Sequence, residues 1–426
     1  MDNGKTIAIV GLGYVGLPLA LLADRKGYHV IGVDVNAEKV DAINKRIPPF
    51  VDHDVAEQLK SSSLDATTDF GRIKDAFIVI ICVPTPIDEN NIPDLRPVEG
   101  ACRSISPFLQ KGQVVVLEST VNPGVSESIV LPLLEKGSGL TCGKDFHLAH
   151  CPERINPGDK KWNVANISRV IGSFDEMGLQ KAIAFYTSII GAEIKPMASL
   201  KEAEAVKIVE NAFRDINIAF VNELAMSFAR LGIDVVNVIQ GAATKPFAFM
   251  PHFPGCGVGG HCIPVDPYYL IEHAKQNGFQ HEFLSLARRI NNSMPEFTAS
   301  LAVQGLQEVG IGVKGAKIAV LGLAYKAEIG DYRESPSFEI IKALEGYGAD
   351  VIAYDPFVIE KSTVTELDDA LKDRDAIIIA TAHNVFKALK PDHIQNMGVK
   401  VVIDGRNCLA KEGFVKAGMV YKGIGR

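Results

Sequence analysis

Short apolar runs alternate with amphipathic stretches over the first two hundred residues of the chain. Residues 5–36 open with an apolar run that reaches Gly11, Gly13 and Gly16, continue with a helical pattern, and close with a second apolar run that ends at Asp34. Similar runs lie within 76–86, 113–124, 146–158 and 168–173. Continuous apolar strands that alternate with helices predict a parallel sheet covered on both faces.

The pattern changes at about Ser199. Residues 199–231 contain neither Gly nor Pro and follow a helical period, which predicts one helix much longer than the average of about 12 residues. Helical patterning continues past Cys262 to about Asn292 and is expected to resume after 293–297, where a proline interrupts it.

A second unit at 316–356 repeats the design of the first, with an apolar run, a glycine, a helix, a second apolar run and an Asp. Its glycine motif is reduced to Gly322-Leu323-Ala324, and extra residues precede its helix. We interpret this as an internal duplication in which only the first copy kept a pyrophosphate turn. The predicted fold is α/β, with two Rossmann-like doubly wound domains joined by a long central helix and helical segment. The predicted boundaries are 1–198, 199–298 and 299–426.

The composition narrows the class of protein. A net charge of −7 argues against nucleic acid or an anionic membrane as the main partner. No apolar run approaches the ~20 residues of a membrane span, and the first strand begins too early to leave room for a signal peptide. Seven cysteines without a C-x-x-C pair indicate reduced thiols, so the expected location is the cytoplasm.

The first glycine motif predicts a dinucleotide site. Gly11 would permit the tight turn, Gly13 the approach of a pyrophosphate, and Gly16 close packing of helix on strand. Asp34 would accept hydrogen bonds from the adenosine ribose and repel a 2′-phosphate, which favours NAD over NADP. The alternative is a glycine-bearing turn that binds no ligand.

Cys262 lies in the glycine-rich stretch 255–269 and allows three interpretations. A metal site would recruit His252, Cys256 and His261, but their spacing is not that of structural zinc sites, and we predict no metal. A buried inert thiol would not need so many glycines around it. As a nucleophile beside NAD, a thiolate could add to an aldehyde and carry it on to an acid, with Asp266 positioning water or the thiol proton.

Further candidates lie on the long helix and after two strands. Lys207 and Asn211 are four residues apart, with Arg214 near them, so they share a helix face and could bind a developing alkoxide and orient the reacting group. A solvated face is the alternative. Glu118 and Glu153 each follow an apolar run, where ligand groups collect in doubly wound sheets, and either could be the general base.

These motifs taken in order resemble one family. The sequences GLGYVGLP, VPTP, EST, PERINPG, KIVENAFRDINIAFVNE, GVGGHCIPVDP, YKAEIGDYRESPS and DGRN are similar to those of the UDP-glucose/GDP-mannose dehydrogenases. The resemblance implies oxidation of a sugar C6 hydroxyl to a carboxylate in two steps that use two NAD. It also implies a helical dimerisation segment, so that the protein is at least a dimer, and a C-terminal domain that binds the UDP-sugar.

The resemblance also implies roles for individual residues. Cys262 would be the nucleophile, assisted by Asp266 and Lys207, while Asn211 positions the sugar and Glu153 acts as base or orients water. The implied cofactor contacts are Gly11, Gly13, Tyr14, Val15, Gly16, Asp34, Val83, Thr85, Glu118, Thr120, Lys326 and Arg333. The implied substrate contacts are Glu153, Arg154, Lys207, Asn211, Arg214, Gly259, Lys326 and Arg406. The glycines near Cys262 are expected to make room for the sugar C6 carbon.

Two departures narrow the substrate. Pro157 stands where UDP-glucose dehydrogenases usually have a second acidic residue, and His261 replaces a small polar residue. Both resemble the branch that acts on UDP-N-acetylhexosamines, with UDP-N-acetylglucosamine as the first choice and UDP-N-acetylmannosamine as the alternative. The competing hypotheses are a two-electron β-hydroxyacid dehydrogenase, which would leave Cys262 without a role, and a non-catalytic NAD-binding regulator.

Overall fold

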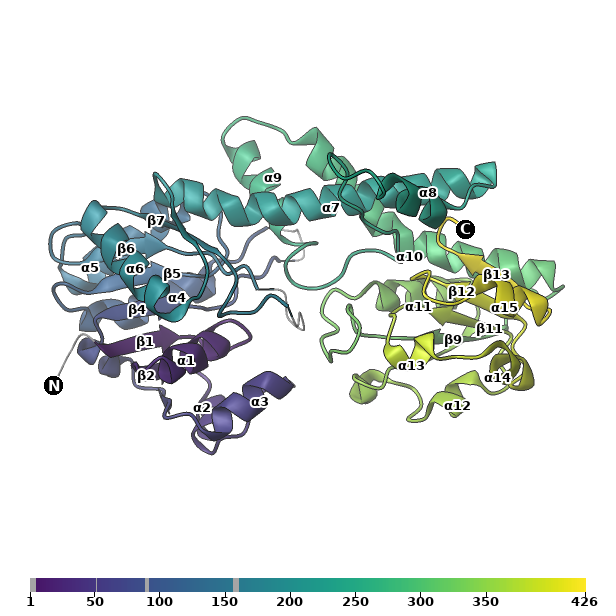
Figure 1. The fold of residues 1–426 in the computed structure, drawn as a ribbon, viewed down its shortest axis with the longest axis horizontal. Helices are drawn as coiled ribbons and strands as arrows, with labels where there is room; N and C mark the ends of the chain where they lie inside the picture. Colours follow the sequence, from purple (N-terminus) through teal and green to yellow (C-terminus); the bar gives the residue numbers. More distant parts are fainter. Residues whose placement is uncertain (1–4, 51, 89–91, 156–160) are drawn as a thin grey trace. The chain divides into compact units, whose positions relative to one another are not determined.

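The computed structural model of the protein describes residues 5–50, 52–88, 92–155 and 161–426, so Pro157 lies outside the described residues. The chain divides into two compact units. The first comprises Met1–Glu210 with Tyr268–His273, and the second comprises Asn211–Pro267 with Ala274–Arg426. Each contains a sheet between layers of helices (Figure 1).

The first unit contains a sheet in the order β3-β2-β1-β4-β5-β6-β7-β8, which begins with the 3-2-1-4-5-6 order of dinucleotide-binding folds. Its strands are β1 (Thr6–Val10), β2 (His29–Val33), β3 (Asp65–Thr67), β4 (Ile78–Ile81), β5 (Val114–Leu117), β6 (His147–His150), β7 (Arg169–Ser173) and β8 (Ile194–Pro196). Its helices are α1 (Gly16–Arg25), α2 (Ala37–Asn44), α3 (His53–Lys60), α4 (Arg96–Ile105), α5 (Leu131–Ser138) and α6 (Glu176–Ile189).

Two strands, β7 and β8, depart from the expected all-parallel sheet. β7 runs antiparallel to β6, with Ala149 opposite Ser173 and His150 opposite Gly172, and β8 is parallel to β7, whereas β1 to β6 are parallel to one another. No helix lies between β6 and β7 in the described residues, and without a crossover helix a strand returns in the opposite direction. The amino end of β7 is therefore at the sheet edge where β5 and β6 end.

Apolar side chains from both faces of the first sheet are buried under helices. Leu17 and Leu21 of α1 and Phe185 of α6 pack with one face, while Cys102 of α4 and Leu134 of α5 pack with the other. Burial on both faces explains why these strands read as continuous apolar runs.

The second unit repeats this architecture. Its parallel sheet has the order β10-β9-β11-β12-β13, the other common doubly wound order. Its strands are β9 (Lys317–Leu321), β10 (Asp350–Tyr354), β11 (Ala376–Ile379), β12 (Val401–Asp404) and β13 (Val420–Gly423). The helices of this sheet are α11 (Pro336–Gly346), α12 (Leu367–Leu371), α13 (Asn384–Lys387), α14 (Pro391–Asn396) and α15 (Lys411–Lys416). The predicted pair of doubly wound domains is confirmed.

The predicted long helix is α7 (Leu200–Leu231), which is followed by α8 (Val235–Ala242), α9 (Asp266–Gln276) and α10 (Glu282–Glu308). The predicted interruption at 293–297 is absent, and α10 continues through Pro295. Met294, Pro295 and Thr298 are buried, and Thr298 Oγ1 donates to the Met294 carbonyl at 2.8 Å, so packing outweighs the ~3 kcal/mol intrinsic cost of an interior proline.

The predicted boundary at 298/299 thus falls inside α10, and the three-part division of the chain stays a prediction. In the part of the chain that the structure describes, no helix is both long and apolar enough to cross a membrane.

Candidate active site

The three glycines of the first turn meet different surroundings. Gly11 has φ +95°, and a Cβ there would lie 2.7 Å from the Cys82 carbonyl oxygen. A Cβ on Gly16 would lie 1.9 Å from the Gly11 carbonyl oxygen, so this position packs backbone on backbone. A Cβ on Gly13 would meet no atom within 4 Å. Open space at Gly13, beside the amino end of α1, fits the pyrophosphate of a dinucleotide.

Asp34 follows β2 and is 6% exposed. Its carboxylate accepts hydrogen bonds from the backbone N–H of Leu12 at 2.8 Å and of Asn36 at 3.0 Å. Asn36 caps α2, and Lys39 in the first turn of that helix places its ammonium 2.7 Å from Asp34 Oδ2. The sequence interpretation missed Lys39, although its position five residues after Asp34 could have drawn attention to it.

Other predicted cofactor residues surround the same sheet edge. Tyr14, 39% exposed, stacks on Phe50 with ring centroids 4.1 Å apart. Val83 and Thr85 follow β4, and their carbonyls accept from Ser119 Oγ at 2.7 Å and Tyr269 OH at 2.6 Å. Val15 and Thr120 are half-buried. The carboxyl ends of β1, β2, β4 and β5 therefore form a sheet edge that fits a dinucleotide.

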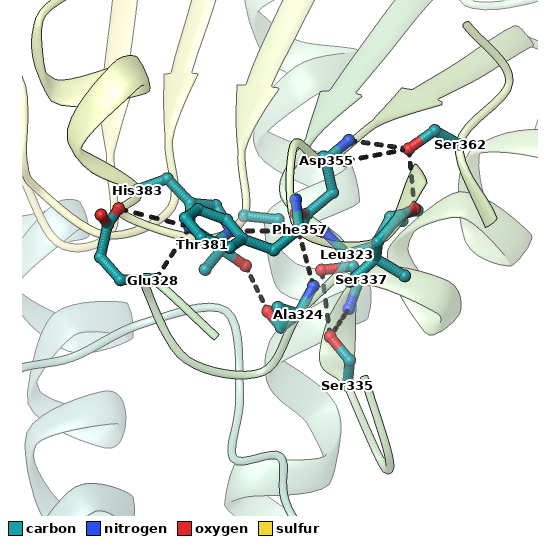
Figure 2. A network of polar contacts seen from close by, with 12 residues as sticks. Leu323, Ala324, Glu328, Ser335, Ser337, Asp355, Phe357, Ser362, Thr381 and His383 are labelled. Carbon is teal, nitrogen blue, oxygen red and sulfur yellow. Dashed lines mark hydrogen bonds and ion pairs between the residues drawn. The ribbon is translucent and has the colours of Figure 1, made fainter. Parts of the chain in front are cut away.

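The duplicated turn of the second unit is filled by its own side chains. Gly322 has φ +101°, as Gly11 has +95°, and Asp355 occupies the position after β10 that Asp34 occupies after β2. The Asp355 carboxylate accepts from Leu323 N at 2.6 Å and Ala324 N at 2.8 Å, and lies 3.0 Å from His383 Nε2 (Figure 2).

The His383 ring is fully buried and stacks on Phe357, with centroids 4.9 Å apart. Its Nδ1 accepts from the Glu328 N–H at 3.0 Å. These contacts hold the pKa of Asp355 below its usual value against the effect of burial. Asp355 is the counterpart of Asp34, which would bind a ribose in the first unit. Its carboxylate is thus occupied by hydrogen bonds within the second unit.

The glycines near Cys262 accommodate the protein itself. A Cβ on Gly259 would lie 2.7 Å from Tyr325 Cβ and 2.8 Å from the Glu334 carbonyl oxygen, and one on Gly260 would lie 2.8 Å from the Tyr325 ring. A Cβ on Gly255 would lie 2.9 Å from an Arg406 nitrogen. These three glycines therefore allow close packing against loops of the second unit, and the expectation that the glycines near Cys262 make room for a sugar carbon stays a prediction.

Cys262, Asp266 and Asn211 lie together in the second unit. The Asp266 N–H donates to the Cys262 carbonyl at 2.8 Å, which links the cysteine to the first turn of α9. Asn211 Nδ2 donates to Asp266 Oδ2 at 2.5 Å, and both side chains are buried, while Cys262 is half-buried. The structure therefore joins three of the predicted catalytic residues through α7 and α9.

A buried polar network supports the loop that carries Cys262. Asn222 of α7 donates to Asn291 of α10 at 2.9 Å and accepts from the Gly255 N–H at 3.0 Å. Asn291 in turn donates to Asp215 at 2.8 Å, and Arg288 donates to the same Asp215 oxygen at 2.5 Å. These residues were not predicted, because each reads as an ordinary polar position of a helix in the sequence.

The residues considered as alternative metal ligands have polar contacts of their own. His261 Nδ1 lies 3.1 Å from Arg333 Nη2, His252 Nδ1 lies 3.0 Å from the Met250 carbonyl, and Cys256 Sγ donates to the Gly405 carbonyl at 3.3 Å. Among the described residues, no group of three or more His, Cys, Asp or Glu side chains has metal-binding geometry.

The second unit also carries Arg333, predicted to contact the cofactor, Arg406, predicted to contact the substrate, and Lys326, predicted to contact both. Arg333 pairs with Asp331 at 2.6 Å, and its carbonyl accepts from the Gly260 N–H at 3.0 Å. Arg406 Nε donates to the Ala380 carbonyl at 2.7 Å, and Lys326 is half-buried. Arg214, in contrast, is exposed on α7.

Glu153 and Arg154 follow β6 in the first unit. Glu153 is 7% exposed, and its Oε1 accepts from the N–H groups of Arg154 and Ile155, each at 2.6 Å. The Arg154 guanidinium is held by Glu210 of α7 at 2.5 and 3.2 Å and by the Ser168 carbonyl at 2.8 Å. Lys207 is 8% exposed, so the solvated-face alternative does not describe it.

Glu118 is even more enclosed, at 1% exposure. Tyr186 OH donates to its Oε1 at 2.5 Å, and Arg169 Nη1 donates to its Oε2 at 3.4 Å. Burial raises the pKa of Glu118 to about 7, although Arg169 opposes that shift. Arg169 and Tyr186 were also missed, and the one available signal was an Arg at the start of an apolar run.

The chain matches the models of one protein family in three successive regions. Models of the UDP-glucose/GDP-mannose dehydrogenase family match the chain with the NAD binding domain at residues 5–190, the central domain at 201–293 and the UDP binding domain at 319–411. The chain belongs to the UDP-glucose/GDP-mannose dehydrogenase family. It is therefore an NAD-dependent oxidoreductase with a UDP-binding domain, and the predicted family, enzyme class and cofactor are confirmed.

Full-length relatives have similar identity to the chain. UDP-N-acetyl-D-mannosamine dehydrogenase of Pyrococcus horikoshii is 38% identical and covers 99% of both chains. UDP-N-acetyl-D-glucosamine 6-dehydrogenase of Pseudomonas aeruginosa is 39% identical over 92% of this chain and 94% of the relative. A solved structure of the P. horikoshii UDP-D-ManNAc dehydrogenase superposes with a TM-score of 0.93 at 37% identity over 99% of both chains.

Proposed function

We propose that the protein oxidises the C6 hydroxyl of a UDP-N-acetylhexosamine to a carboxylate in a four-electron reaction that consumes two NAD per sugar. The first candidate substrate is UDP-N-acetylglucosamine, which yields UDP-N-acetylglucosaminuronate. The observation that carries the proposal is the connection of Cys262 to Asp266 and Asn211 in a chain with an NAD binding domain. A two-electron dehydrogenase would have no use for a nucleophile there.

The residues of the chain divide the chemistry between them. NAD, when bound, accepts the hydride in each oxidation. Lys207 stabilises the developing alkoxide, and Asn211 orients the sugar. The Cys262 thiolate adds to the aldehyde to form a thiohemiacetal, which becomes a thioester on the second oxidation, and Glu153 and Asp266 direct the water that releases the acid.

The same proposal assigns the residues that bind the cofactor and the substrate. Gly11, Gly13, Gly16 and the Asp34–Lys39 pair hold the dinucleotide, with the remaining predicted cofactor residues except Glu118 around them. Lys326, Arg406 and Gly259, together with Arg154 and Arg214, are proposed substrate contacts. Cytoplasmic location is part of the same proposal.

UDP-N-acetylmannosamine is the second candidate substrate. A relative with that substrate in its name is 38% identical over 99% of this chain, and one named for the glucosamine sugar is 39% identical over 92%. The two sugars differ only in configuration at C2, which one polar contact can discriminate.

We expect Cys262→Ala to abolish acid formation, because no thiohemiacetal can form, while the dissociation constant for NAD stays within about twofold of the original. Cys408→Ala is the matched control, since it removes another half-buried free thiol. Acid production is measured by chromatography and NAD binding by calorimetry. Undiminished acid from the Cys262 variant would remove this residue from the mechanism.

A further inference from the structure

The antiparallel strand β7 brings an arginine to the edge of the first sheet where β5 and β6 end. The register pairs Ala149 with Ser173 and His150 with Gly172, and its continuation sets Glu153 opposite Arg169. A parallel strand would begin at the other edge, far from the residues that follow β6. The reversal of β7 therefore places Arg169 next to Glu153.

Arg169 bridges two carboxylates inside the first unit. Its side chain is fully buried, Nη2 lies 2.8 Å from Glu153 Oε2, and Nη1 lies 3.4 Å from Glu118 Oε2. The ring of Tyr186 lies under the guanidinium at 6.0 Å, and its hydroxyl donates to the other oxygen of Glu118. Glu118 and Tyr186 thus fix the far side of Arg169.

The Glu153 carboxylate is consequently held at both oxygens. Backbone N–H groups of Arg154 and Ile155 hold Oε1, and Arg169 pairs with Oε2. A carboxylate that must direct water needs one orientation, and a misplacement of about 1 Å can cost a hundredfold in rate. Stability alone does not account for the cluster, because well-packed apolar side chains are often at least as stabilising as a buried ion pair.

We propose that Arg169 and Glu118 are positioning residues that hold the Glu153 carboxylate in its working orientation. Glu118 fixes Arg169 in place, and it is neither a cofactor contact nor the general base. This inference rests on the proposed role of Glu153 in catalysis. It adds two residues that act through Glu153.

The charge of Glu118 gives the proposal a pH signature. Burial is the main cause that raises its pKa to about 7, Arg169 lowers it, and Glu153 raises it. Burial also raises the pKa of the other acidic groups that face it, which therefore stay neutral: Cys82 near β4, Cys151 after β6 and Tyr186 of α6. Glu118 is thus charged, and fixes Arg169, only above about pH 7.

The test is Glu118→Gln in the full-length protein. We expect kcat for acid formation to fall about tenfold near pH 8.5 and to equal the wild-type value near pH 5.5, because Gln mimics the protonated carboxyl. KM and NAD affinity should stay within about twofold. The melting temperature at pH 8.5 should not fall. A carboxyl whose pKa is raised in the folded state makes the protein less stable as it ionises, and Gln does not ionise. An unchanged kcat and pH profile would overturn the proposal.

Glu153→Gln separates this inference from the proposed function. If kcat survives Glu153→Gln, the catalytic role of Glu153 fails, and the positioning role fails with it. If Glu153→Gln lowers kcat, Glu118→Gln should cost nothing further in the double variant, because it acts through Glu153. Equal losses from Glu118→Gln in both backgrounds would show that Glu118 acts independently and would overturn the inference.

Discussion

One carboxylate in each doubly wound unit binds the turn that follows the first strand. Asp34 and Asp355 both accept backbone N–H groups of that turn, at Leu12 and at Leu323. They differ in the group that faces their other side, which is the Lys39 ammonium for Asp34 and the buried His383 ring for Asp355. This difference is consistent with one NAD site and one diverged copy.

We expect Asp34→Asn to weaken NAD binding and to raise the NADP/NAD ratio of kcat/KM by at least about tenfold. Asn keeps an acceptor for the Leu12 N–H, but it removes the charge that repels a 2′-phosphate and leaves the Lys39 ammonium to attract one. Steady-state kinetics with both cofactors measure the ratio. The double variant Asp34→Asn/Lys39→Ala should lose most of the gain, and an unaltered preference would place Asp34 away from the ribose.

Sequence patterns identified the residues whose spacing is local and missed those that meet through the fold. The glycine turn and Asp34 belong to one βαβ unit, so their spacing predicted their geometry. Arg169 reaches Glu153 only because β7 is reversed, and Asn222 of α7 links the Cys262 loop at Gly255 to Asn291 of α10. Strand direction and helix pairing depend on tertiary packing, which no local pattern records.

The long helix α7 has several polar residues on its buried side and three large apolar residues on its exposed side. Lys207, Asn211, Asp215 and Asn222 are buried, whereas Val209, Phe213 and Phe220 are 58%, 45% and 52% exposed. At 100° per residue these two sets lie on opposite sides of the helix. Periodicity predicted the helix correctly but not which side faces inward, because polar residues interrupt the apolar pattern of the buried side.

The exposed apolar side of α7 supports the proposal that the protein forms at least a dimer. Phe213 also contacts the ring of His252, in a segment where Phe247, Met250 and Phe253 are exposed as well. Clustered exposed aromatic side chains are typical of protein–protein interfaces.

We expect Phe220→Glu to weaken self-association by at least about a hundredfold, since a symmetric dimer loses the burial of two phenyl rings and gains two buried charges. Val415→Glu, at an apolar residue of α15 that is 50% exposed, is the control and should not change the mass in solution. Sedimentation equilibrium gives both masses. A Phe220 variant that associates as the original protein does would place the interface elsewhere.

The molecule as a whole combines two related folds with different chemistry. The first unit has an open glycine turn, and the second has a filled turn beside the Cys262 loop. The duplication and the fold class could be read from the sequence, because both copies repeat the strand, turn and helix order. The glycines of the Cys262 loop could not be interpreted in that way, since their neighbours Tyr325 and Glu334 come from a distant part of the chain.

The proposed function is a four-electron oxidation that uses Cys262. The decisive measurement is the number of NADH formed per mole of sugar consumed, with UDP-glucose, UDP-N-acetylglucosamine and UDP-N-acetylmannosamine tested in parallel. About two NADH per sugar, with an N-acetylhexosamine as the best substrate, is the predicted result. About one NADH per sugar would contradict the account, because it would make the protein a simple alcohol dehydrogenase in which Cys262 has no catalytic role.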